Sequence, residues 1–340
     1  MLFSLLFVTT NFANKYVLSI LKFTYPTIFQ GWQTLVGVVM FRALVSTGHL
    51  DGLLHGKEWH ECALWLPGMM FFLISIYSGS KALATLPIPV FLSMQNMSLV
   101  FRATADLIGY RKIVSVYTYV MMMMTLASAL AIAKTDPQFE PDGYLWICVH
   151  IVSLGVFEIY TNLMKGRLKL RPTERLFCCY FYSVIVLAPC SYFLGDALEA
   201  ATFPYLYFGQ FYVGCILSGV LGMLMNLCAI RLHEANSSHS FLDISTVQSI
   251  AKMFCAATSL AFYDMSFSST FNLFLIVNML CTFGFSESSS HWRIQQESQM
   301  NHSKSDQNLE TSLPWGLDEE IPAGLKRHEL QQDMIRVQMS

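Results

Sequence analysis

The stretch KTDPQFEPDG, residues 134–143, divides the chain into two long apolar regions. It holds three carboxylates, two prolines and a glycine, a composition that ends helices. A helix that crosses a bilayer needs about 20 mostly apolar residues, and five segments of that kind lie on each side of the stretch. The ten predicted spans are residues 1–21, 25–47, 62–80, 87–108, 113–133, 144–164, 176–195, 205–230, 243–263 and 267–285.

The composition of the whole chain also indicates a membrane protein. Of its 340 residues, 54% are hydrophobic and 13% are charged, whereas soluble globular proteins carry about 25% charged residues. The mean hydropathy is +0.45. So much apolar surface needs a lipid bilayer around it, and we expect an all-α membrane protein. The net charge of −2 offers no electrostatic basis for binding nucleic acid, so we expect no such partner.

The number of spans on each side of the central stretch predicts an inverted repeat. Five crossings bring the second set into the membrane with the opposite orientation, so we expect ten transmembrane helices as two inverted five-helix repeats, residues 1–133 and 134–285. Transporters built in this way bind their substrate near the bilayer midplane, between the halves. Residues 286–340 carry 5 basic and 9 acidic side chains and many serines, which predicts a disordered cytosolic tail.

Positive charge in the loops predicts the orientation of the chain. Basic residues stay on the cytosolic side of a membrane, and the connector 165–175 (KGRLKLRPTER) holds five of them against one acid. Arg111 and Lys112 follow the fourth predicted span, whereas residues 134–143 hold one lysine and three acids. We therefore expect both termini in the cytosol. The glycosylation sequon that starts at Asn236 then lies in a cytosolic loop and should carry no glycan.

Two lysines inside predicted spans are candidates for the substrate site. A lysine at the centre of a span costs about 3 kcal/mol on insertion scales, so it usually faces a cavity or a partner. Lys252 lies near the middle of the ninth span, and Gln248 precedes it by one turn on the same helical face. The alternative for Lys252 is a structural ion pair with a carboxylate of another span. Lys15 lies nearer a membrane end, where it either joins the site or extends to the lipid headgroups.

Some of the other charges in the predicted spans have a candidate partner nearby in the sequence. Arg102 and Asp106 are four residues apart on one predicted helix and are expected to form an ion pair. Glu158 has no local partner in the sequence. Because the deepest predicted charge is a lysine rather than a carboxylate, an anionic substrate is favoured over an organic cation.

No motif predicts metal or cofactor chemistry. The nine cysteines lie almost all in apolar runs and have no zinc or redox spacing, so we expect them to act as small apolar fillers, with no metal and no cofactor. Motifs of metal-dependent sugar transfer, acyl transfer and hydrolysis are also missing from the sequence. We therefore expect a protein that is not an enzyme. A membrane-embedded transferase with a less recognisable site, or a non-transporting scaffold, remains the competing class. The aromatic residues Tyr77, Tyr182 and Trp32 can stack on a base or sugar, although ordinary packing explains each equally well.

Several stretches resemble the nucleotide-sugar transporter family of the drug/metabolite transporter superfamily, especially its GDP-mannose branch. They are AsnLysTyrValLeuSer at 14–19 with Gln33, IleTyrSerGlySerLysAlaLeu at 76–83, IleProValPhe at 88–91, and Gly143-Tyr144 with Trp146. Gln95-Asn96 stands where the family has Lys-Asn, and Asp106 stands where it has Glu. The resemblance covers nearly all of residues 10–265.

The two recognition motifs of this family are altered in the present sequence. The seventh-span Phe-Tyr-Asn-Asn, which contacts the base in relatives, is PheTyrSerVal at 181–184, with the downstream proline kept at Pro189. The ninth-span Gly-Ala-Leu-Asn-Lys, which contacts ribose, phosphate and sugar in relatives, is GlnSerIleAlaLys at 248–252. The lysine is retained. Both base-reading asparagines are replaced, which argues against guanine because an unpaired buried polar group costs about 1–3 kcal/mol.

The resemblance implies the activity. The run LysPheThrTyrProThr-x-PheGlnGlyTrpGlnThr at 22–34 is similar to a divergent vertebrate group of the family, for which import of UDP-N-acetylglucosamine into the Golgi is the expected role. We therefore predict a multi-pass antiporter of the Golgi membrane that exchanges this nucleotide sugar for a nucleoside monophosphate, with a homodimer as a candidate assembly. GDP-mannose or another nucleotide sugar is the alternative cargo. The predicted substrate-binding residues are Lys252, Gln248, Ser249, Tyr182, Ser183, Asn96, Lys15 and Tyr77.

Overall fold

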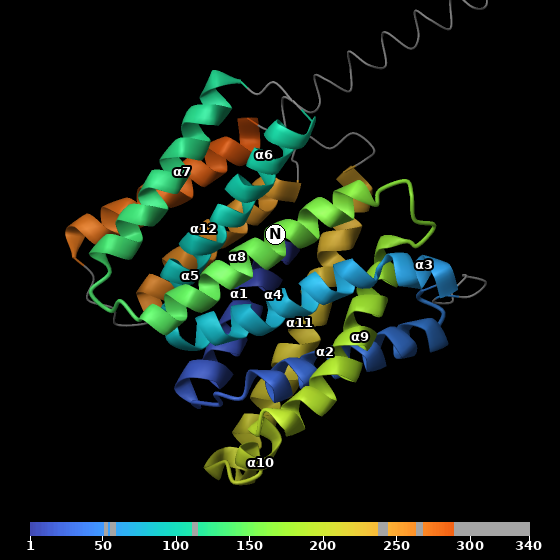
Figure 1. Ribbon diagram of the computed structural model, residues 1–340. Helices are drawn as coiled ribbons and strands as arrows, with labels where there is room; N and C mark the ends of the chain where they lie inside the picture. Colours follow the sequence, from blue (N-terminus) through green and yellow to red (C-terminus); the bar gives the residue numbers. More distant parts are fainter. Residues whose placement is uncertain (51–53, 55–58, 111–114, 237–243, 263–267, 289–340) are drawn as a thin grey trace, which may run out of the picture. The chain divides into compact units, whose positions relative to one another are not determined.

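All regular structure in the described part of the chain is helical, as Figure 1 shows. A computed structural model describes residues 1–50, 54, 59–110, 115–236, 244–262 and 268–288, which belong to one compact unit. Seven helices in this part are long and apolar enough to cross a membrane. They confirm an all-α, multi-pass membrane protein.

The helices follow the predicted spans closely. The first five spans correspond to α1 (Leu2–Lys15) with a π-helix (Tyr16–Ile20), α2 (Pro26–Ser46), α4 (Leu66–Thr85), α5 (Ile88–Gln95) with α6 (Met97–Tyr110), and α7 (Val116–Thr135). The second five correspond to α8 (Pro141–Leu163), α9 (Pro172–Phe193), α11 (Gly209–Asn236), α12 (Ile244–Phe262) and a last helix (Ser269–Ser288). Between them lie the short helices α3 (Trp59–Leu64), α10 (Asp196–Ala200) and a 3₁₀ turn (Pro204–Tyr207).

Prolines and caps explain where the boundaries differ from the prediction. The third span was expected at 62–80 but runs to Thr85, just before Pro87. The seventh was expected from 176 and begins at Pro172, because proline suits the first turn of a helix. In that turn the Glu174 carboxylate accepts a hydrogen bond of 2.7 Å from the backbone N–H of Arg171.

The fourth predicted span, 87–108, is divided at one residue into two helices. α5 ends at Gln95 and α6 begins at Met97, so Asn96 alone separates them. The irregularity is local: Asn96 keeps helical backbone angles (φ −60°, ψ −22°), its N–H bonds to the Leu92 oxygen at 3.2 Å, and the residue is 1% exposed.

The long helices pack in pairs around a polar interior. α4 packs on α8, α2 packs on α9, and α1 packs on both α11 and α12 (Figure 1). The largest apolar cluster of buried side chains draws on α1, α4, α5, α8, α11 and α12. The last helix continues to Ser288, three residues past the expected end of the second repeat at 285. The rest of the predicted tail, 289–340, lies outside the described residues.

Candidate functional site

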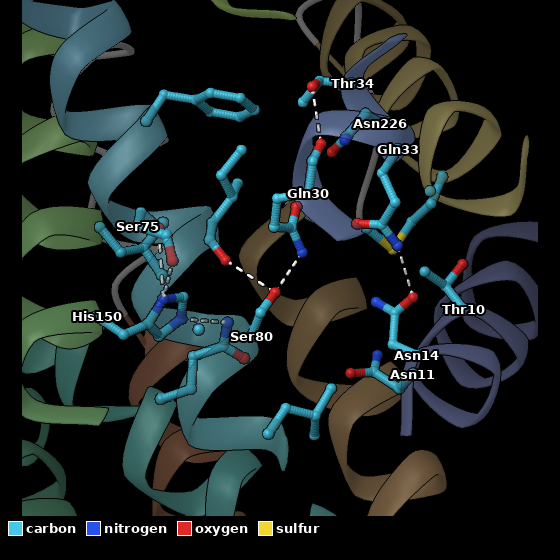
Figure 2. Close-up of a pocket in the computed structure, with 18 of the residues that line it drawn as sticks. Thr10, Asn11, Asn14, Gln30, Gln33, Thr34, Ser75, Ser80, His150 and Asn226 are labelled. Atoms are coloured by element: carbon cyan, nitrogen blue, oxygen red, sulfur yellow. Dashed lines mark hydrogen bonds between the residues drawn. The ribbon is translucent and has the colours of Figure 1, made fainter. Parts of the chain in front are cut away.

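A cavity of about 430 Å³ lies between α1, α2, α4, α5, α8, α9, α11 and α12. This volume falls in the range of about 300–1,000 Å³ that is usual for small-molecule sites. Figure 2 shows that polar side chains reach it from several helices. The polar lining residues are Thr10, Asn11, Asn14, Gln30, Gln33, Thr34, Ser75, Ser80, Gln95, His150, Glu158, Tyr180, Asn226 and Gln248.

Part of the lining comes from the middle of long helices. Ser75–Ser80 fall in the centre of α4, Leu154 in the centre of α8, and Gly219–Asn226 in the centre of α11. Other lining residues, such as Gln95 at the end of α5 and Gln248 near the start of α12, lie closer to helix ends. The cavity therefore includes, but is not confined to, mid-helix depth.

Amide side chains from α1 and α2 form one wall of the cavity. Gln33 donates a hydrogen bond of 2.9 Å from Nε2 to Oδ1 of Asn14, and the Ser218 hydroxyl donates one of 2.6 Å to the same oxygen. Gln30 donates from Nε2 to the Ser80 hydroxyl (Figure 2). Since Asn14 and Gln33 are already bonded to each other, this wall is held in place before any ligand arrives.

His150 forms the opposite wall, where it contacts α4 and α5. Its Nδ1 lies 2.9 Å from the backbone oxygen of Ser75, and its Nε2 lies 3.3 Å from Nε2 of Gln95 (Figure 2 shows the Ser75 contact). The ring also packs against Phe91, with the ring centres 5.6 Å apart. Gly79 makes room for it, because a Cβ at that position would lie 2.9 Å from Nδ1.

Tyr180 brings α9 and α11 together at the cavity. Its hydroxyl accepts a hydrogen bond of 2.7 Å from Nδ2 of Asn226. The ring lies directly over Gly37 of α2, where a Cβ would come within 2.3 Å of it. The close approach of α2 and α9 therefore depends on a residue without a side chain.

A second, smaller cavity of about 210 Å³ lies near Pro26 at the start of α2, Thr85 at the end of α4 and Asp142 at the start of α8. Lys81 and Trp146 also line it, with the ammonium 6.0 Å from the centre of a Trp146 ring. Ser80 lines both cavities. Ser80 is thus the one described residue common to the two linings.

Of the predicted site residues, Gln248 lines the large cavity. Ser249, the next residue on α12, is 2% exposed, and its hydroxyl lies 2.9 Å from the Ser245 oxygen and 2.8 Å from Oγ of Ser286. It faces the last helix rather than the cavity.

The predicted base-reading motif of α9 is turned away from the cavity. The Ser183 hydroxyl donates a hydrogen bond of 2.8 Å to the Cys179 oxygen of its own helix and is fully buried. Tyr182 packs on the apolar cluster around Trp65. Two residues correspond to about 200° around a helix, so α9 presents Tyr180 to the cavity where Tyr182 was expected. Tyr77 also lies outside the lining, with its ring edge-on to Trp146 at 5.6 Å.

Lys252 is buried beside the cavity and bonded to an amide. Its Nζ donates a hydrogen bond of 3.1 Å to Oδ1 of Asn96, whose Nδ2 donates one of 3.0 Å to Oδ1 of Asn278. Asn278 in turn donates to the Thr125 oxygen at 3.1 Å and the Ser128 hydroxyl at 3.0 Å. Within the described residues Lys252 forms no salt bridge, so the alternative of a structural ion pair is not what this structure has.

Lys15 is neither at the cavity nor at the headgroups. Its Nζ donates hydrogen bonds of 2.8 Å to the backbone oxygens of Leu83 and Leu86, and the residue is 7% exposed. These oxygens lie at the end of α4. Backbone oxygens in the last turn of a helix have no hydrogen-bond partner within the helix. Lys15 therefore caps α4 from α1.

Arg102 has a partner on another helix that the sequence did not predict. Its Nη1 lies 3.0 Å from the Glu158 carboxylate of α8, with both side chains about a quarter exposed. The side chain of Asp106, the expected partner, lies outside the described residues, so that pair stays a prediction. Glu158 had no predicted partner because Arg102 is 56 residues away along the chain.

The amide-lined walls are the part of the site that sequence reasoning missed. The overlooked residues are Asn11, Asn14, Gln30, Gln33, Gln95, His150, Tyr180 and Asn226. A signal for four of them is present in the sequence: Asn11 with Asn14, and Gln30 with Gln33, are three residues apart inside apolar helices, a spacing that places each pair on one face.

Two curated relatives are both described as UDP-N-acetylglucosamine transporters. The chain is 35% identical to the UDP-N-acetylglucosamine transporter TMEM241 homolog of Xenopus laevis, over 82% of this chain and 92% of the relative. It is 33% identical to the UDP-N-acetylglucosamine transporter TMEM241 of Mus musculus, over 79% and 89%. The GDP-mannose transporter of Chaetomium globosum is more distant, at 21% identity over 76% and 69%.

Other comparisons add the fold alone. No protein-family model matches the chain. One solved crystal structure of a protein matches 87% of this chain and 98% of its own, with a TM-score of 0.53 and 10% identity. The identity and coverage of the two TMEM241 relatives are high enough to define the family. The chain belongs to the nucleotide-sugar transporter family, within its TMEM241 group.

Proposed function

We propose that this chain imports UDP-N-acetylglucosamine into the Golgi lumen in exchange for a nucleoside monophosphate. The observation that carries the proposal is the cavity, whose lining includes amide or hydroxyl side chains from seven helices. Such groups suit a cargo made of a base, two sugars and their hydroxyls. The names of the relatives at 35% and 33% identity support this cargo, because both are described as UDP-N-acetylglucosamine transporters.

The pattern of helix packing supports the inverted repeat that alternating access requires. In a repeat of five, α8 corresponds to α1, α9 to α2, α11 to α4, and α12 to α5 with α6. The packing of α4 on α8 then has its counterpart in α11 on α1, and that of α1 on α12 in α8 on α5 and α6. Likewise, α2 on α11 corresponds to α9 on α4. We infer ten transmembrane helices related by this exchange, with the cargo between the halves.

Lys252 is the proposed phosphate ligand. The cavity itself supplies no free cation among the described lining residues, and the diphosphate needs one in a medium of low dielectric constant. Lys252 lies one turn from Gln248, which lines the cavity, and bonds to Asn96, the neighbour of the lining residue Gln95. A flexible lysine that gives up one bond to a neutral amide can turn to the phosphates at little cost.

Uptake by the reconstituted protein tests the proposal. Proteoliposomes that contain the purified chain are expected to take up radiolabelled UDP-N-acetylglucosamine, and UMP loaded inside should stimulate the uptake. GDP-mannose, UDP-glucose and CMP-sialic acid complete the panel. Empty liposomes give the background. If no nucleotide sugar in the panel is exchanged, the transporter proposal is wrong and a scaffold or transferase role takes its place.

Location and assembly are finer parts of the same proposal. Both termini are placed in the cytosol, following the basic connector 165–175. Immunofluorescence of a tagged chain against a Golgi marker, with selective permeabilisation of the plasma membrane, tests the compartment and the termini together. Light scattering of the purified protein in detergent tests the homodimer.

A further inference from the structure

Among the described lining residues, two buried side-chain atoms have no hydrogen-bond partner, Oγ1 of Thr10 and Oε1 of Gln95. Oε1 of Gln95 is buried and unpaired, and it is the only buried amide oxygen of this kind among the described lining residues. A buried polar group without a partner is costly, and native structures rarely keep one without a reason. An unpaired hydroxyl such as that of Thr10 can rotate toward a backbone oxygen, whereas a carboxamide oxygen cannot change from acceptor to donor.

His150 fixes which end of the Gln95 amide is unpaired. Its Nδ1 is 2.9 Å from the Ser75 oxygen, which only accepts, so Nδ1 carries the ring hydrogen of the neutral imidazole. Its Nε2 is then an acceptor and requires a donor, which is Nε2 of Gln95 at 3.3 Å. The amide nitrogen is thereby occupied, and the oxygen is left without a partner in the wall, where it has almost no accessible surface, so a ligand in the cavity reaches it only when a neighbouring side chain moves aside. The Ser75–His150–Gln95 chain therefore presents a lone acceptor.

A lone acceptor selects a ligand group that only donates. Phosphate oxygens and carbonyls have no hydrogen to give, whereas a hydroxyl can donate but also carries lone pairs that lose their water when it is buried. An N–H group donates one hydrogen bond and needs none in return. If the cargo is the proposed nucleotide sugar, two such groups exist: the imide N–H of uracil and the acetamide N–H of the sugar.

We propose that Gln95 is a specificity-determining residue whose Oε1 accepts a hydrogen bond from an N–H of the cargo, and that His150 is the positioning residue that holds it in this orientation. The inference rests on the proposed function for the identity of the cargo. It depends on the geometry of the wall for the chemistry, which is acceptance from a donor.

Ligand-induced thermal stabilisation of the purified protein tests the proposal without requiring transport. The ligands are UMP, N3-methyl-UMP, UDP-N-acetylglucosamine and UDP-2-deoxyglucose, and the last of these replaces UDP-glucose because the 2-hydroxyl of glucose is itself a donor. N3-methyl-UMP lacks the imide hydrogen, and UDP-2-deoxyglucose has no donor at carbon 2 of the sugar. The variants are Gln95→Met, which removes the acceptor at similar size, and His150→Phe, which keeps the contact with Phe91 but releases the amide. Ser93→Ala is the matched control, since Ser93 is on α5 with an unpaired buried oxygen and does not line the cavity.

The expected result is a loss of discrimination in one ligand pair. The wild type and Ser93→Ala should prefer the N–H ligand of that pair by about tenfold or more, the usual value of a buried hydrogen bond. Gln95→Met should bind both members equally, and His150→Phe should fall between. Loss in the UMP pair assigns the imide, and loss in the sugar pair assigns the acetamide.

Two outcomes would overturn the inference in different ways. If the wild type is stabilised by nucleotides but Gln95→Met keeps both preferences, Gln95 does not read an N–H and the inference fails alone. If no nucleotide stabilises the wild type, the proposed function fails as well. The ratio of the two affinities in a ligand pair distinguishes a folding defect from a loss of recognition. A purely structural change weakens the binding of both members of the pair alike.

Discussion

The ammonium of Lys252 and the carboxamide of Asn96 are joined by a hydrogen bond of 3.1 Å, between α12 and the single residue that separates α5 from α6. This bond places the deepest lysine of α12 at a helix interruption. A neutral oxygen compensates a cation only in part, so the lysine remains attractive to an anion. The same bond couples whatever binds Lys252 to the geometry of the interruption.

Substitution of Lys252 should remove exchange of nucleotide sugars. Lys252→Ala is expected to abolish uptake in proteoliposomes because no other cation replaces it at the phosphates. Lys252→Arg keeps the charge but changes the donor geometry, so we expect a partial loss of about tenfold or less. Equal activity of Lys252→Ala and wild type would contradict a phosphate contact.

Neutralisation of Glu158 by Arg102 should favour the binding of an anionic cargo in the cavity. Glu158 lines the cavity, and Arg102 neutralises it at 3.0 Å. Arg102→Met leaves an unpaired carboxylate there and should weaken binding of an anionic cargo several-fold, whereas Arg102→Met with Glu158→Gln should restore it. A double-mutant cycle on the KM of uptake measures the coupling. Additive effects would show that Arg102 and Glu158 act on the cargo independently, which would contradict the proposed neutralisation.

The contact between Gly37 and Tyr180 gives a test of the cavity wall. Gly37→Ala places a Cβ about where the Tyr180 ring lies, at 2.3 Å, and must displace the ring and its bond to Asn226. We expect a lower melting temperature and reduced uptake. Gly31→Ala on the same helix is the control, because its Cβ meets its nearest neighbour at an ordinary 3.7 Å. That variant should fold normally, and similar defects in both would point to a general sensitivity of α2.

Lys15 should matter for stability rather than for cargo. Lys15→Met leaves the oxygens of Leu83 and Leu86 without their donor, which should cost about 1–3 kcal/mol because unpaired buried acceptors are unfavourable. The melting temperature should fall, while the KM of the folded fraction stays near that of the wild type. A change of KM without a change of stability would return Lys15 to the substrate site.

Glycosylation tests the orientation of the chain. Asn236 ends α11, and its sequon should carry no glycan if that end faces the cytosol. Glu199→Asn with Ala201→Thr creates a sequon at exposed positions near α10, in the loop that the proposal places in the lumen. Only the created site should gain mass that an endoglycosidase removes. Glycan at Asn236 would invert the proposed topology.

The helices could be predicted from sequence because their signals are local. Apolar runs of membrane length and prolines such as Pro26, Pro141 and Pro172 mark them within a few residues. The break at Asn96 could not be predicted in this way, since it depends on contacts with α12 and the last helix that join residues more than 150 positions apart. The apolar sequence of the span does not indicate those contacts.

The site was predicted less well because a motif does not specify the rotation of its helix. Tyr182 and Ser183 match the family motif by position, yet Tyr180 is the residue of α9 that reaches the cavity. Gln248 lines the cavity, and Lys252, one turn later on the same helix, lies beside it. The role proposed for His150 and Gln95 depends on the contact between their side chains, and 55 residues separate them in the chain. Three-dimensional proximity is what reveals their joint chemistry.

The shared wall at Ser80 has a consequence for how cargo would move. Ser80 is the one described residue common to the two linings, and its hydroxyl is bonded to the Gln30 amide. A cargo that passed this residue would have to replace that bond. A molecule rich in hydroxyls can offer such a replacement, whereas an apolar one of equal size cannot. Passage at Ser80 would therefore favour sugars over apolar compounds.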